Sequence, residues 1–109
     1  KSWMRSLPNY KQLHITNPAT GDLKRIAEYT ERIWGAKQKE KYISHMKTCF
    51  DALCHNTNLG KIYGDIDNTL YSHVCQRHMI FYRVGVKSVN IIRVLHQSMD
   101  FTAQFSGNK

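Results

Sequence analysis

Apolar and small residues recur every three or four positions in two consecutive segments, the spacing of one face of an amphipathic helix. The first segment follows Asn17 and Pro18, which suit a helix cap and a first helical position. Its periodic residues are Leu23, Ile26, Ala27, Thr30, Ile33 and Trp34. Those of the second segment are Tyr42, Ile43, Met46, Cys49, Phe50 and Leu53. Because only a short link at Gly35 separates them, the pattern predicts an antiparallel helical hairpin.

The rest of the chain has the composition of strands. β-Branched and aromatic residues dominate 70–75, 79–84 and 88–96, and polar or Gly-containing links separate these runs. Residues 10–16 alternate loosely in polarity and predict a first strand, whereas 56–60 read as a loop. Residues 90–95 are apolar on both faces, which predicts a central strand. Adjacent Phe81 and Tyr82 should face opposite sides, one in the core and one at the surface.

These elements predict one α+β domain over residues 10–105, preceded by an N-terminal extension of residues 1–9. Their order is β-α-α-β-β-β. The helical hairpin should pack on a twisted antiparallel sheet, because neither layer can bury its apolar side alone.

Charge narrows the class of partner. Sixteen Lys and Arg against eight Asp and Glu give a net charge of +8. The surplus favours partners with negative charge, whether nucleic acid, an acidic protein segment or an anionic surface. No apolar run is long enough for a membrane helix and no signal-peptide core is present, so we expect a cytoplasmic protein without a membrane partner.

Cysteine and histidine suggest no cofactor. The odd number of cysteines, at positions 49, 54 and 75, includes no C-x-x-C pair, and this predicts reduced thiols. Cys49 and Cys54 are five residues apart, which indicates core packing rather than redox chemistry. The six histidines form no convincing ligand pair on one element, so the sequence predicts no metal and no cofactor.

Three separated segments resemble a known family. The first runs from Asp22 to Gly35 and includes Tyr29 and Trp34. The second is the loop Asn58-Leu59-Gly60. The third begins with Ile80 to Arg83 and continues with residues 92–96 and Met99-Asp100. In order and spacing these segments resemble the ParE branch of the RelE/ParE toxin superfamily over roughly residues 10 to 101. The sequence departs from that pattern in the loop, where a proline commonly precedes the Leu-Gly pair.

The resemblance implies the toxin of a type II toxin–antitoxin system, of the kind that serves plasmid maintenance. DNA gyrase is the typical target of this branch, and a cognate ParD-like antitoxin holds the toxin, in some cases within a higher-order complex. The alternative is a ribosome-dependent mRNA endoribonuclease of the RelE type, and a third class is a domain that only binds the antitoxin. The His-Tyr or Lys-Tyr ending of several RNA-cutting relatives is absent from the tail at 100–105, which favours a binding poison without catalytic residues.

The candidate site residues fall into two sets. For target binding we predict five residues expected on the last two strands: Arg77, Tyr82, Arg83, Arg93 and His96. Arg93 interrupts an apolar strand, so it should either pair with Asp22 or Asp100 or belong to the target surface. For antitoxin binding we predict Lys37, Lys41 and Lys47. The alternative without a binding role is that these lysines form a solvated helix face.

Overall fold

The computed structural model describes residues 10–106, and it contains the predicted order of elements with two additions. The first half holds β1 (Gln12–Ile15), α1 (Asn17–Trp34) and α2 (Ala36–His55). After a 3-10 turn, Thr57–Leu59, come β2 (Lys61–Ile62), β3 (Tyr71–Cys75), β4 (His78–Val84), β5 (Ser88–His96) and α3 (Phe101–Ser106). The short β2 and α3 were not expected from the sequence pattern. The proposed extension at 1–9 lies outside the described residues.

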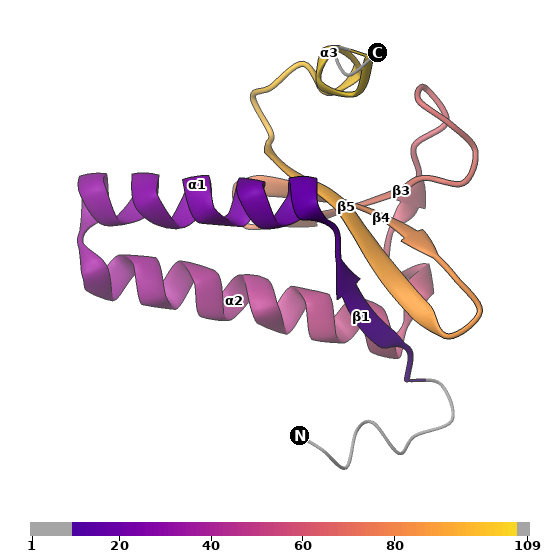
Figure 1. The fold of residues 1–109 in the computed structure, drawn as a ribbon, viewed down its shortest axis with the longest axis horizontal. Coiled ribbons are helices and arrows are strands. Elements are labelled where there is room, and N and C mark those ends of the chain that lie inside the picture. Colours follow the sequence, from indigo (N-terminus) through magenta and orange to yellow (C-terminus); the bar gives the residue numbers. More distant parts are fainter. Residues whose placement is uncertain (1–9, 107–109) are drawn as a thin grey trace.

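The two helices form the expected antiparallel hairpin, as Figure 1 shows. The cap of α1 is Thr16 rather than Asn17: the Thr16 hydroxyl accepts a bond from the Ala19 amide at 3.4 Å. Gly35 separates the helices with φ of 93°, a left-handed conformation that glycine adopts without a Cβ clash. Its amide donates to the Glu31 carbonyl and ends α1.

The sheet is mixed, which corrects the prediction of a wholly antiparallel sheet. Its strand order is β1-β5-β4-β3-β2, and β1 pairs with β5 in parallel while the other pairs are antiparallel. β5 lies between β1 and β4, as its apolar character predicted. The sequence pattern locates a strand but does not say which strand it pairs with. Here β1 pairs with β5, the last strand of the chain, although the helical hairpin and three other strands separate them in sequence.

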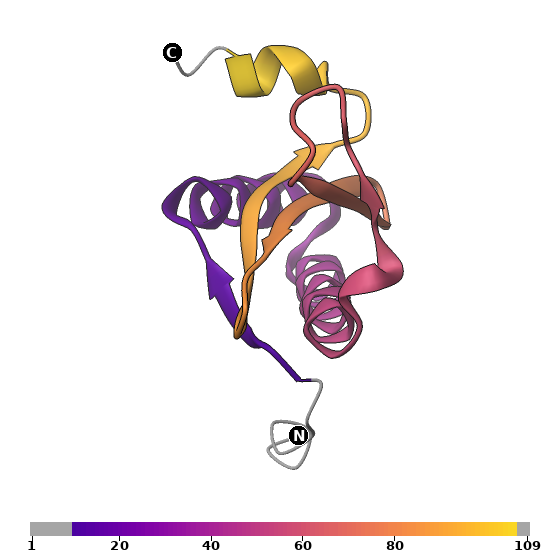
Figure 2. The same cartoon turned by 90° about the vertical axis from the view of Figure 1, so that its right-hand side faces the viewer.

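Both faces of the sheet carry a core. The hairpin packs on one face around Phe50, Met46, Ile80 and Tyr82. On the other face, Phe81 lies beneath α3 and the 63–70 loop, together with Leu70, Leu95, Tyr63, Ile66, Phe101 and Phe105. Figure 2 shows α3 and this loop side by side beyond the sheet. Phe81 and Tyr82 are therefore both fully buried, and the prediction that one of them is at the surface is wrong.

A disulfide joins α2 to β3. It links Cys49 and Cys75, which are separated by 26 residues in sequence, and it overturns the prediction of reduced thiols for this pair. Cys54 takes no part in the disulfide and is buried in the core, as expected. Within residues 10–106, none of the helices combines the length and the apolar character that crossing a membrane requires.

Candidate functional site

A pocket of about 1040 Å³ opens where α1 and α2 meet the ends of β4 and β5. We call it the arginine–histidine pocket, since Arg25, Arg77, Arg93, His78 and His96 line it. Its apolar lining includes the large exposed side chains of Tyr29, Trp34 and Met99, with Trp34 67% exposed. The pocket therefore combines cationic groups with accessible aromatic surface, which is the composition of a binding surface for a partner with acidic and apolar groups.

A buried carboxylate organises one wall of the pocket. Asp22, 4% exposed on α1, accepts two bonds from Arg93 on β5, at 2.8 Å from Nε and 2.9 Å from Nη2. It also accepts the Val94 amide at 2.9 Å and the exposed Arg25 at 2.8 Å. Hydrogen bonds from Arg93 to this carboxylate raise the pKa of the guanidinium, which stays charged. The expected structural pairing of Arg93 with Asp22 is thus confirmed.

A second wall holds two imidazoles and a phenol. The His78 and His96 rings meet edge to face with centroids 5.2 Å apart. Tyr42 Oη lies 2.6 Å from His78 Nδ1 and accepts the Arg77 amide at 3.1 Å, so its own proton can go to Nδ1. Burial, and then the charge of His96, lower the pKa of His78 to about 4. His78 is therefore neutral at physiological pH, and its Nδ1 is already occupied.

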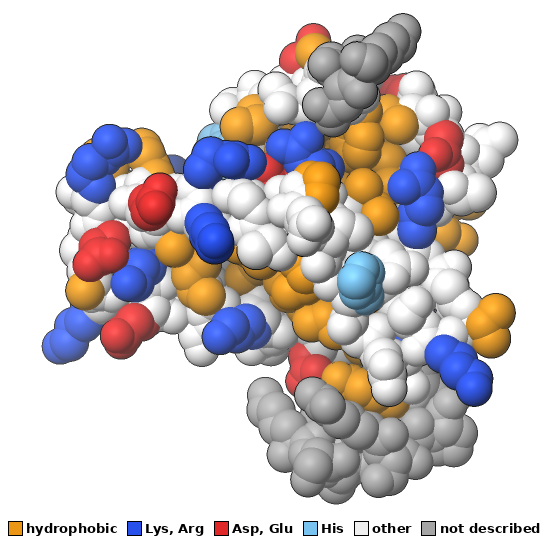
Figure 3. Space-filling view, in the orientation of Figure 1, with side chains coloured by type: hydrophobic (Ala, Val, Ile, Leu, Met, Phe, Trp, Pro, Cys, Tyr) orange, Lys and Arg blue, Asp and Glu red, His pale blue; other side chains and the backbone are white. Residues whose placement is uncertain are grey.

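A larger groove of about 1850 Å³ runs between α1, α2 and β1, and we call it the α1–α2–β1 groove. Its apolar residues include Leu23, Ala27, Ile43, Met46 and Phe50, and its cations are Lys11, Lys24, Lys47 and Lys87. Figure 3 shows hydrophobic side chains in the furrow between the helices, with basic side chains on both rims.

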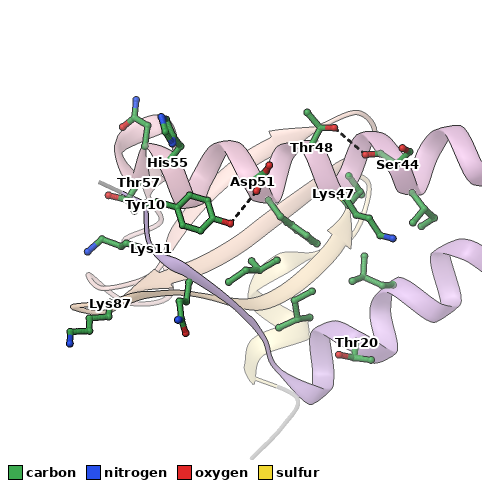
Figure 4. Close-up of a pocket in the computed structure, with 18 of the residues that line it drawn as sticks. Tyr10, Lys11, Thr20, Ser44, Lys47, Thr48, Asp51, His55, Thr57 and Lys87 are labelled. Carbon is green, nitrogen blue, oxygen red and sulfur yellow. Dashed lines mark hydrogen bonds between the residues drawn. The ribbon is translucent and has the colours of Figure 1, made fainter. Parts of the chain in front are cut away.

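The β1 side of this groove is a sheet edge, because among residues 10–106 β1 pairs with β5 alone. Figure 4 shows Tyr10 lying across the groove, where its hydroxyl donates to Asp51 at 3.2 Å, and Lys47 projecting from α2. A sheet edge, an apolar floor and a lysine rim suit an extended acidic chain.

Comparison with known proteins decides the family. The family model described as "ParE toxin of type II toxin-antitoxin system, parDE" matches residues 13–101. Toxin ParE1 of Caulobacter vibrioides is 32% identical over 93 residues, covering 85% of this chain and 96% of the relative. The chain belongs to the ParE toxin family. Toxin ParE1 of Mycobacterium tuberculosis is 30% identical over 80% of this chain and 91% of its own length. Toxin ParE of Escherichia coli is 28% identical over 84% of this chain and 90% of its own length.

Solved structures support the fold of this ParE family member. A chain of the chromosomal ParDE toxin–antitoxin system from P. aeruginosa aligns with a TM-score of 0.70 and 18% identity, over 81% of this chain and 97% of that one. The toxin–antitoxin complex RelBE2 from Mycobacterium tuberculosis aligns with a TM-score of 0.62 and 17% identity, over 85% and 98%. The predicted RelE/ParE-like α+β fold is confirmed.

The structure gathers three of the five residues proposed for target binding. Arg77, Arg93 and His96 all line the arginine–histidine pocket. Arg77 lies in the turn between β3 and β4 rather than on a strand, and it is exposed. His96 is half-buried, and its Nδ1 lies 2.8 Å from the Ser98 hydroxyl.

Tyr82 does not reach this surface. It is fully buried, and its hydroxyl accepts the Gly60 amide at 3.0 Å and donates to the Thr57 carbonyl at 2.9 Å. Burial raises the pKa of the Tyr82 phenol. The proposed role in target binding is therefore corrected to a structural one, in which Tyr82 anchors the loop after α2. Only the tertiary fold reveals this, since strand alternation leaves either face possible.

Arg83 also lies apart from the other candidates, because it lines neither the pocket nor the groove. It forms an ion pair with Asp67 and donates to the Thr69 hydroxyl at 3.1 Å. Hydrogen bonds from Thr69 and then Arg83 hold the pKa of Asp67 well below its usual range. Arg83 therefore braces the 63–70 loop.

The three lysines proposed for antitoxin binding are divided. Lys47 lines the α1–α2–β1 groove, whereas Lys37 and Lys41 are exposed on α2 outside it. The other lysines that line the groove are Lys11, Lys24 and Lys87, which the sequence analysis did not identify. Isolated lysines on separate elements form no local pattern, so only the fold reveals that they converge.

Proposed function

We propose that this ParE family toxin acts in the cytoplasm, where it poisons DNA gyrase, blocks replication, and is neutralised by a ParD-like antitoxin. The observation that carries the proposal is the character of the arginine–histidine pocket. It combines a fixed Arg93, an exposed Arg77 and exposed aromatic surface at Tyr29 and Trp34. Such a pocket suits tight binding, because Arg and aromatic side chains contribute most of the free energy of many interfaces.

The pocket's acid–base groups argue against RNA cleavage. A general base must be free to accept a proton, yet His78 Nδ1 is already engaged by Tyr42. The Arg93 guanidinium is bound to Asp22 through two of its donors, which reduces its capacity to stabilise a phosphorane. These engagements favour the binding poison over the nuclease.

The ribosome-dependent endoribonuclease remains the second candidate because of one observation. His96 is half-buried rather than fully buried, and it stands beside His78 and near Arg77 in the same pocket. An accessible imidazole next to a cation is a possible acid–base centre for cleavage of a ribose-linked phosphate.

We propose that the antitoxin occupies the α1–α2–β1 groove. Four lysines from four segments converge there around an apolar floor, beside the edge strand β1. An acidic, initially flexible segment could neutralise the lysines and bury its own apolar side chains in the furrow. Folding on binding would give a negative heat-capacity change.

The decisive experiment is a supercoiling and DNA-cleavage assay with purified gyrase, run beside a translation assay with purified ribosomes. We expect loss of supercoiling and accumulation of cleaved DNA, with intact messenger RNA. Induction without the antitoxin should arrest growth. Cleavage of ribosome-bound RNA with unaffected gyrase would establish the second candidate, and normal growth with folded protein present would leave only the antitoxin-binding domain.

Matched variants locate the target surface. Arg77→Ala removes an exposed cation of the pocket and should weaken gyrase inhibition by about tenfold or more. Arg83→Ala, which removes an equal charge from β4 at its ion pair with Asp67, outside the pocket, should leave inhibition within about twofold. Equal effects of the two changes would show that net charge rather than the pocket is responsible.

A second matched pair tests the antitoxin groove. Lys24→Glu with Lys47→Glu reverses two charges that line the groove, and Lys37→Glu with Lys41→Glu reverses two charges outside it. Calorimetry with the antitoxin should show at least about tenfold weaker binding for the first pair only. A larger loss for the second pair would place the antitoxin elsewhere on α2.

A further inference from the structure

His45, Cys49 and Cys75 form a cluster of metal-binding residue types outside both the pocket and the groove. Their ligand atoms all lie within 4.8 Å of one another. His45 and Cys49 are four residues apart on α2, so their side chains emerge on the same helix face. Cys75 comes from the end of β3, where the disulfide holds it against Cys49.

We propose that, once this disulfide is reduced, His45, Cys49 and Cys75 form a binding site for a thiophilic divalent metal ion of the zinc class. Two thiolates and one imidazole are a ligand set that zinc adopts in proteins. Thiolate sulfur discriminates against Mg²⁺ and Ca²⁺, which prefer oxygen ligands.

The geometry requires only small movements. From zinc–sulfur and zinc–nitrogen bond lengths, two ligands on one tetrahedral ion lie roughly 3.5–4 Å apart. The His45 nitrogen lies within 4.8 Å of both sulfur atoms, and these two must move apart to this separation once their bond is reduced. His45 is exposed, Cys49 is half-buried and Cys75 is buried, so the ion would lie at the protein surface with a fourth position open to water.

The disulfide and the metal exclude each other, because both use the same two sulfur atoms. A dithiol reductant supplies two electrons and two protons, breaks the Cys49–Cys75 bond, and becomes a disulfide itself. Metal binding then displaces the two thiol protons to solvent, leaving two thiolates on the ion. In a reducing cytoplasm the metal would replace the covalent bond as the link between α2 and β3.

The sequence pattern brings together two of the three ligands. His45 and Cys49 have a spacing that one helical turn brings together, but the third ligand follows Cys49 by 26 residues. The sequence-based expectation of no metal rested on spacings within single elements, which cannot reveal a ligand from another strand.

The test uses Co²⁺ as a spectroscopic probe and Zn²⁺ as its competitor. The full chain is reduced with dithiothreitol, freed of it under nitrogen, and checked by thiol counting and circular dichroism. We expect one equivalent of Co²⁺ to produce a thiolate-to-cobalt absorption band that Zn²⁺ abolishes. The oxidised protein should show no such band. Absence of the band in the reduced, folded protein would overturn the proposal.

Variants identify the ligands. His45→Gln changes an exposed residue and should weaken Co²⁺ binding by at least about tenfold, since even outer-shell changes at metal sites cost that much. Cys49→Ser should remove most of the charge-transfer band. The controls Cys54→Ser and His14→Gln lie outside the cluster and should bind as the wild type does. Unchanged binding by His45→Gln, or loss of binding in Cys54→Ser, would refute the assignment.

Discussion

Replacing Asp22 should destabilise this small protein more than any exposed charge change. The carboxylate is buried and accepts hydrogen bonds from Arg93, the Val94 amide and Arg25. Asp22→Ala leaves the Arg93 guanidinium, whose side chain is 14% exposed, without its partner. Breaking a buried ion pair from one side costs about 3–5 kcal/mol, against a total of about 5–15 kcal/mol for a typical domain.

Arg25 provides a matched control because it contacts the same carboxylate from the solvent. Its side chain is 68% exposed, although its 2.8 Å contact with Asp22 is as short as that of Arg93. Solvent screening limits an exposed ion pair to about 1 kcal/mol or less. Arg25→Ala should therefore cost at most about 1 kcal/mol. Burial, rather than distance, decides the difference between the two arginines.

A double-mutant cycle isolates the pair. Asp22→Ala combined with Arg93→Met removes both charges, leaving mainly the Val94 amide unsatisfied, at about 1–3 kcal/mol. The double variant should thus lose at least about 2 kcal/mol less than the sum of the single losses. Urea unfolding followed by circular dichroism measures all four proteins, with constant m-values as the check. Additive losses, or an Arg25→Ala loss equal to that of Asp22→Ala, would refute this account.

Three further outcomes are expected. In Gly60→Ala, the new Cβ would clash with the Tyr82 hydroxyl oxygen and lie 2.6 Å from the Ser72 carbonyl oxygen, so urea unfolding should show a loss of about 1–3 kcal/mol. Adding Tyr82→Phe should recover little of this loss, since the Ser72 carbonyl stays and the hydroxyl's bonds to Gly60 and Thr57 are lost; full recovery would refute the second clash. The pKa of His78 is about 4 when folded and about 6.5 when unfolded, so the unfolded chain binds the extra proton and stability falls as pH drops from 6.5 to 4. Relative to His78→Gln, the wild type should lose at most about 2–3 kcal/mol across that window in urea titrations, because partial exposure to solvent screens the charge, and parallel pH profiles would contradict the shift. Phe101→Ala removes a ring whose centroid lies 5.0 Å from that of Phe81 and should lower the free energy of unfolding by about 1–3 kcal/mol, whereas an unchanged melting temperature would show that α3 adds nothing to the second core.

The sequence alone determined the helices, most strands and the family. Hydrophobic periodicity is a local property, so the hairpin and β5 could be located from the spacing of their apolar residues. Arg93 could be predicted to need a partner because an unpaired charge in an apolar strand is costly, and Asp22 was one of two acids proposed.

Only the tertiary structure decided which distant residues meet. Strand pairing placed β1 parallel to β5. Helix α3 covers the face of the sheet that the strand pattern had assigned to solvent, so Phe81 and Tyr82 are both buried. The lysines of the α1–α2–β1 groove and the Cys49–Cys75 pair converge for the same reason. Such contacts depend on how the chain returns on itself, and residue spacing along one element carries no information about that path.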